Sequence, residues 1–113
     1  MRPVTTIATM LFSAFVTQPV FAADAVGISE TTVHSPARGK DLALTVWYPS
    51  DGKGTQAPSG EDRIFQGTPV FKDGAVKTGR LPLVLLSHGS GSRVSGMAWI
   101  AAKLASEGFI VAG

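Results

Sequence analysis

The most informative stretch of the sequence is Leu81-Pro82-Leu83-Val84-Leu85-Leu86-Ser87-His88-Gly89-Ser90-Gly91-Ser92, an apolar run that ends in a glycine-rich turn. Residues 83–86 are apolar at every position, which is typical of a strand buried on both faces of a parallel sheet. Pro82 has no N–H for the sheet ladder, so it fits only at the start of such a strand. The stretch predicts a strand from about 81 to 87, followed by a turn whose backbone N–H groups can approach an anion.

The spacing of the glycines separates three kinds of anion-binding turn. A dinucleotide-binding G-x-G-x-x-G/A pattern is weakened because Val94 stands at the third position. A phosphate-binding G-x-x-x-x-G-K-[ST] loop is excluded because Met97 stands where the lysine is needed. The remaining pattern is His88-Gly89-Ser90-Gly91 after a strand, where a backbone N–H can stabilise an oxyanion.

With Trp47-Tyr48-Pro49 upstream and Gly108-Phe109-Ile110-Val111-Ala112 downstream, this segment resembles the N-terminal part of an α/β-hydrolase of the dienelactone hydrolase and platelet-activating factor acetylhydrolase-like group. The resemblance covers nearly all of the chain after residue 22. It implies an α/β fold that begins with an antiparallel hairpin and continues as a parallel strand-helix-strand unit. It also implies that the backbone N–H of Ser90 belongs to an oxyanion hole, with His88, Gly89 and Gly91 supporting the loop.

The chain is shorter than the domain of the hydrolases that it resembles. The chain has 113 residues, whereas such hydrolases form one domain of more than about 200 residues. Residues 23–113 are therefore expected to be an incomplete N-terminal part of the domain, with one face of the sheet left exposed. The nucleophile, acid and base are expected beyond Gly113.

The N-terminus has the features of a secretory signal peptide. Met1-Arg2-Pro3 precedes an apolar run over 4–16 and a small-residue exit that ends at Ala22. The run is shorter than the roughly 20 apolar residues that span a bilayer, so no stable membrane anchor is expected. We expect cleavage near Ala22 and export to the periplasm or the medium. The chain has no cysteine, which excludes disulfides and thiolate metal sites.

The charge pattern gives no indication of a nucleic-acid partner. The chain has 10 Lys and Arg against 8 Asp and Glu, and removal of Arg2 with the leader brings the balance close to neutral. The basic residues are scattered, without the clusters and interleaved aromatics of a phosphate-tracking groove.

The first half of the mature chain predicts a hairpin and a loop. A strand around 29–33 and a period-two strand over 42–48 flank a turn with Pro36 and Gly39, and Pro49 is expected to end the second strand. Trp47 and Tyr48 are interpreted as strand packing. Residues 50–80 carry many glycines and two prolines, which predicts a long loop. This loop is either a substrate rim or a surface segment held by its apolar pairs 64–65 and 70–71.

The second half predicts a helix and a strand. A helix from about Val94, capped by Ser92, carries an apolar stripe of Met97, Ile100, Ala101 and Leu104. Gly108 and Phe109 fit the positions of a Schellman stop, and residues 109–112 return as the next parallel strand.

The catalytic residues of a serine hydrolase are only partly present. No serine in the turn, neither Ser90, Ser92 nor Ser95, stands in a G-x-S-x-G elbow. We interpret His88 as a brace for the loop. The resemblance implies that the full-length parent is an exported serine-type hydrolase of small-molecule carboxylic esters or lactones, which needs no cofactor or metal, and that residues 23–113 alone are inactive. The alternatives are a non-catalytic binding or interaction protein of the same fold and an inert truncated product.

Overall fold

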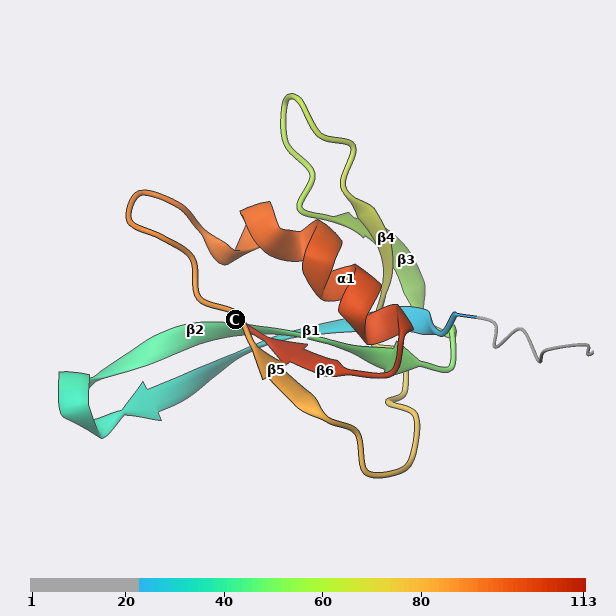
Figure 1. Ribbon diagram of the computed structural model, residues 1–113, viewed down its shortest axis with the longest axis horizontal. Helices are drawn as coiled ribbons and strands as arrows, with labels where there is room; N and C mark the ends of the chain where they lie inside the picture. The colour runs from blue at the N-terminus through green and yellow to red at the C-terminus, as the bar shows by residue number, and fades with distance from the viewer. Residues whose placement is uncertain (1–22) are drawn as a thin grey trace, which may run out of the picture.

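The computed structural model describes residues 23–113, in which one short helix lies across a mixed sheet (Figure 1). The elements follow in the order β1 (Ala25–Ser35), η1 (Pro36–Arg38), β2 (Lys40–Ser50), β3 (Thr55–Ser59), β4 (Thr68–Lys72), β5 (Leu83–Leu85), η2 (Val94–Met97), α1 (Ala98–Ser106) and β6 (Ile110–Ala112). The strand order in the sheet is β3-β4-β1-β2-β6-β5. The predicted signal peptide falls on residues 1–22, outside the described part.

The predicted fold class is wrong. The described chain is a mixed sheet of 6 strands with a single short helix, so its regular secondary structure is mostly strand and it lacks the repeated strand-helix-strand units of an α/β-hydrolase N-terminal portion. β1 pairs antiparallel with β2 and parallel with β4, while β2 pairs antiparallel with β6. Only β5 and β6 form a parallel pair joined through a helix.

The predicted antiparallel hairpin is confirmed, but Pro49 does not end its second strand. β1 and β2 stay in register from Ala25 opposite Ser50 to Ser35 opposite Lys40. The carbonyl of Pro49 accepts the N–H of Lys77 at 2.9 Å. Because N and C=O of one strand residue point to the same side, the ring nitrogen of Pro49 also faces away from β1. The proline therefore removes no hydrogen bond from the β1–β2 ladder, and the strand continues to Ser50.

The segment 50–80 is not a continuous loop, because it contributes β3 and β4 to the sheet. These strands form an antiparallel hairpin with Thr55 opposite Lys72 and Ser59 opposite Thr68. Val70 from β4 is buried in the core, which agrees with its predicted role as an attachment point. Ile64 and Phe65 do not share that role, since they are 83% and 66% exposed at the tip of the hairpin.

The core lies between α1 and one face of the sheet. The helix buries a face of small residues, Ala98, Ala101, Ala102 and Ala105, against Val26, Trp47, Val70 and Val111. This face is rotated from the predicted stripe, whose larger members Met97, Ile100 and Leu104 are only half-buried. The small alanine side chains let the helix backbone lie close to the sheet. The indole of Trp47 fills the core between the helix and the sheet.

The two ends of the helix differ in how well the sequence predicts them. Ser92 is not the N-cap of the helix. A 3₁₀ turn from Val94 to Met97 precedes α1, and the residue at its N-cap is Arg93. The Schellman stop is confirmed: the N–H of Phe109 donates to the carbonyl of Leu104 at 3.2 Å, and the N–H of Gly108 donates to that of Ala105 at 3.1 Å.

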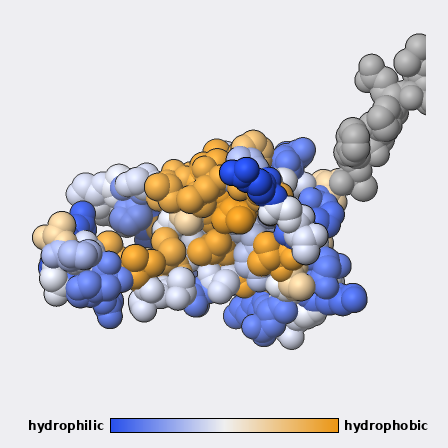
Figure 2. Space-filling model, turned by 90° about the horizontal axis from the view of Figure 1, so that it is seen from below, coloured by the Kyte–Doolittle hydropathy of each residue, from blue (hydrophilic) through white to orange (hydrophobic). Residues whose placement is uncertain are grey.

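The face of the sheet opposite α1 is open at β5, as expected for a sheet covered by one helix. Leu83 and Leu85 are 61% and 74% exposed, whereas Val84, between them in sequence, packs against the core. Figure 2, which views the molecule from the β5 side of Figure 1, shows apolar residues gathered in a broad patch on this surface.

Tyr48 makes the stability of the fold sensitive to alkaline pH. Its buried hydroxyl donates to the carbonyl of Gly74 at 2.9 Å. Burial, followed by the charges of Asp73 and Asp51, raises the pKa of Tyr48 above its usual value of 10.0. The unfolded chain therefore loses this proton at lower pH than the folded chain does. The stabilising contribution is complete below about pH 10 and is lost as pH rises through the folded pKa.

We expect Tyr48→Phe to remove part of this alkaline decline. At pH 8 the variant should be less stable by about 1 kcal/mol, the typical net value of one hydrogen bond. As pH rises above about 10, the difference from wild type should shrink. Urea unfolding of the two proteins across this range measures both effects, and a constant difference at all pH values would contradict the role given to Tyr48.

Candidate functional site

The glycine-rich turn that follows β5 is well defined. The N–H of Ser92 donates to the carbonyl of Gly89 at 3.1 Å, and Gly91 has φ 75°. A four-residue turn with a positive φ only at its third residue is of type II, and a side chain at that position would be strained. Ser90 is the second residue of this turn. Its N–H donates to no backbone carbonyl within residues 23–113.

The predicted site residues lie on this exposed turn or, for His88, directly before it. His88, Gly89, Ser90 and Gly91 are each exposed, and the segment projects from the end of β5 before the chain enters η2 (Figure 1). The Nδ1–H of His88 donates to the carbonyl of Gly89 at 3.0 Å. His88 thus contacts the turn's own backbone, the kind of contact expected of a brace. The role of Ser90 in an oxyanion hole stays a prediction.

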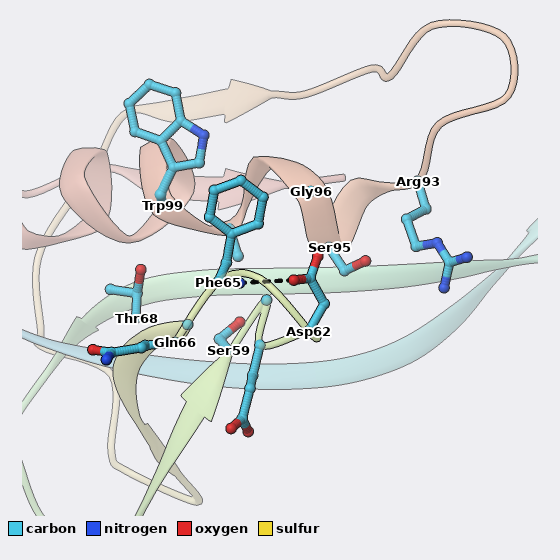
Figure 3. A pocket seen from close by; sticks show the side chains of 13 residues that line it. Ser59, Asp62, Phe65, Gln66, Thr68, Arg93, Ser95, Gly96 and Trp99 are labelled. Atoms are coloured by element: carbon cyan, nitrogen blue, oxygen red, sulfur yellow. Dashed lines mark hydrogen bonds between the residues drawn. The ribbon is translucent and has the colours of Figure 1, made fainter.

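A cleft of about 690 Å³ lies between the 59–68 segment and the 93–99 segment. Its walls come from the β3–β4 connection on one side and from η2 and the first turn of α1 on the other (Figure 3). None of residues 87–92 lines it. The structure therefore brings the site residues together on the turn but does not place them in the cleft.

The β3–β4 connection is fixed by the carboxylate of Asp62. Its Oδ1 accepts the N–H groups of Ile64 and Phe65, each at 2.8 Å, and the N–H of Asp62 donates to the carbonyl of Phe65 at 3.0 Å. The two N–H donors, with a smaller contribution from Arg93, lower the pKa of Asp62. The carboxylate is therefore ionised at neutral pH and holds Phe65 in place.

The floor of the cleft is formed where the two walls touch. A Cβ on Gly60 would lie 2.7 Å from both the Ala98 side chain and the Ser95 carbonyl oxygen, so only glycine allows this approach. Next to it, the buried hydroxyl of Ser59 accepts the Nε1–H of Trp47 at 3.3 Å. The connection is thus attached both to α1 and to the core.

Two exposed aromatic side chains stand at this cleft, Phe65 at 66% and Trp99 at 67% exposure. No function was predicted for Trp99, and Phe65 was predicted only as part of a substrate rim or of an apolar pair that holds the segment to the surface. A signal for Trp99 was present, because an aromatic residue outside the apolar stripe of a helix is expected to face solvent. Nothing in the sequence indicated that the two rings would line the same cleft.

Other kinds of site find no support in the described part of the chain. Within residues 23–113, no group of three or more His, Cys, Asp or Glu side chains is placed to hold a metal ion. In the same range no helix has the length and apolar character needed to cross a membrane.

Comparisons with protein-family models, with curated proteins and with solved structures found no match to this chain.

Proposed function

We propose that the protein is an exported serine-type hydrolase of carboxylic esters or lactones, in which the Ser90 N–H stabilises the oxyanion. The most direct support is the backbone N–H of Ser90. It lies on an exposed type II turn, and no backbone carbonyl of residues 23–113 accepts it. The second support is the resemblance of residues 87–91 to the loop of the dienelactone hydrolase group.

In this reaction a serine hydroxyl attacks the ester carbonyl, and the carbonyl oxygen gains negative charge in the tetrahedral intermediate. A preorganised N–H at the oxygen stabilises that charge more than it stabilises the ground state, which lowers the barrier. His88 holds the turn through the Gly89 carbonyl. The turn supplies neither the nucleophile nor the acid and base of this reaction, and the proposed chemistry requires no cofactor or metal.

The test is an activity measurement on the full-length exported protein. We expect labelling by a fluorophosphonate, which reacts with activated serines, and hydrolysis of short-chain esters or lactones. N-terminal sequencing of the exported protein should begin near Ala23. Absence of both labelling and turnover on a panel of acyl chains would overturn the proposal.

Binding without catalysis is the second candidate function, and the cleft between the 59–68 and 93–99 segments favours it. A protein of this kind would bind a small molecule and fail to react with the fluorophosphonate. The same two measurements therefore separate the two candidates.

A further inference from the structure

We propose that the cleft between the 59–68 and 93–99 segments binds a flat, uncharged aromatic molecule whose ring contacts Phe65 and Trp99. The inference does not rest on the proposed hydrolase activity, because the turn residues 87–92 lie outside the cleft.

The size of the cleft suits a small molecule. Its volume of about 690 Å³ falls within the roughly 300–1,000 Å³ of known small-molecule sites. Its walls are contributed by two segments far apart in sequence, the β3–β4 connection and the start of α1. Sites of this kind, at the junction of separate elements, are where ligands commonly bind.

The apolar surface of the cleft is aromatic. Phe65 and Trp99 come from different elements, yet both line the cleft, and Figure 3 shows their rings extending in the same direction. Each is about two-thirds exposed, at 66% and 67%. Leaving two large rings in water forfeits the stabilisation that their burial would give. A flat ring placed against them would recover this area and add the favourable contact between aromatic rings.

The polar groups of the cleft favour an uncharged ligand. Ser59, Thr68, Ser95 and Gln66 offer neutral hydroxyl and amide groups. The Asp62 carboxylate already accepts two backbone N–H groups. Glu61 and Arg93 are exposed and opposite in charge, and Arg93 extends away from the two rings in Figure 3. The charges of Glu61, Asp62 and Arg93 together leave one net negative charge at the cleft. This charge disfavours an anionic ligand.

The cleft is formed before any ligand binds. Three hydrogen bonds within residues 62–65 fix the turn that carries Phe65. The close contact of Gly60 with Ser95 and Ala98 holds this turn against the helix that carries Trp99. Little ordering is therefore needed on binding, which lowers its entropic cost.

The test is calorimetric titration of the whole protein with 2-naphthamide and with its saturated analogue decahydro-2-naphthamide. We expect saturable binding of the aromatic amide and markedly weaker binding of the saturated one. The anion 2-naphthoate should also bind more weakly. Absence of saturable binding of 2-naphthamide, or equal binding of the saturated analogue, would overturn the proposal.

Variants locate the binding to the cleft. Phe65→Ser and Trp99→Ser should each weaken binding by about tenfold or more. Ile64→Ser is the matched control, because Ile64 is the exposed neighbour of Phe65 and does not line the cleft. It should bind as the wild type does. An equal loss in Ile64→Ser and Phe65→Ser would show that the binding is elsewhere.

The Asp62 pair of variants tests the preformed turn. Asp62→Asn keeps an oxygen that can accept the two N–H groups and should retain binding. Asp62→Ala removes the acceptor and should weaken binding, although Asp62 supplies no ring. Equal binding by the alanine and asparagine variants would show that the turn does not position Phe65.

Discussion

Replacing Ser90 by proline is expected to lower kcat for ester hydrolysis by about 10²–10³-fold, the usual effect of losing one oxyanion-hole donor. Proline has no N–H, so the substitution removes the donor itself. The turn should survive the change. Ser90 is the second residue of a type II turn, the position at which proline is favoured, and its N–H makes no backbone hydrogen bond within residues 23–113 that the turn could lose.

Ser90→Ala is the matched control for this substitution. It removes the hydroxyl and keeps the N–H, so kcat should stay within about twofold of wild type if the N–H is the active group. Both variants are assayed in the full-length protein on the best ester substrate, with circular dichroism to check the fold. A loss in Ser90→Ala as large as that in Ser90→Pro would assign the function to the hydroxyl, contrary to the proposal.

The parts of the fold that the sequence predicted are those set by local chemistry. The β1–β2 hairpin follows from alternating apolar residues and from a turn at Pro36 and Gly39. The stop of α1 follows from Gly108 and Phe109, whose N–H groups reach carbonyls at most five residues away. Contacts of this length leave a direct pattern in the sequence.

The parts that sequence reasoning missed depend on contacts between distant segments. β3 and β4 contain Pro58 and Pro69, which stand opposite each other in the register and argue against strand when read alone. β4 is held by its pairing with β1, over 40 residues earlier in the chain. The fold class was wrong for this reason, because a segment interpreted as loop supplies two of the strands.

The helix face shows the same limit. Two sets of residues have the spacing of a helical stripe. One is the predicted set, Met97, Ile100, Ala101 and Leu104, and the other is the set of buried alanines. The choice between them is made by Trp47, whose large side chain occupies the core and requires small residues above it. A pattern within the helix does not contain that information.

The same distinction between local and long-range contacts applies to the candidate site. The turn at 89–92 was predicted because it is continuous in sequence, and the structure adds the type II geometry that makes Ser90→Pro a clean test. The cleft was not predicted, because Phe65 and Trp99 lie on segments far apart in the sequence that come together in the fold, where Gly60 packs closely against the start of α1.

Trp47→Ala is expected to cause the largest loss of stability, about 3–5 kcal/mol, as for other large-to-small changes of buried aromatic residues. Trp47 is 1% exposed and belongs to the core beneath the alanine face of α1. The helix cannot move down to fill the space, because its backbone is already held close to the sheet by Ala101 and Ala105, both fully buried. The cavity should therefore remain. The buried Ser59 hydroxyl would also lose the Nε1–H that it accepts.

Urea unfolding of the full-length protein measures this loss, with two variants to separate its causes. Trp47→Phe keeps much of the volume but removes the N–H, so it should cost less than Trp47→Ala. Leu85→Ala changes an apolar residue that is 74% exposed on the open face, and it should alter the free energy of unfolding by no more than about 0.5 kcal/mol. A Trp47→Ala effect as small as that of Leu85→Ala would mean that α1 does not pack on Trp47, and the arrangement of the core described above would be wrong.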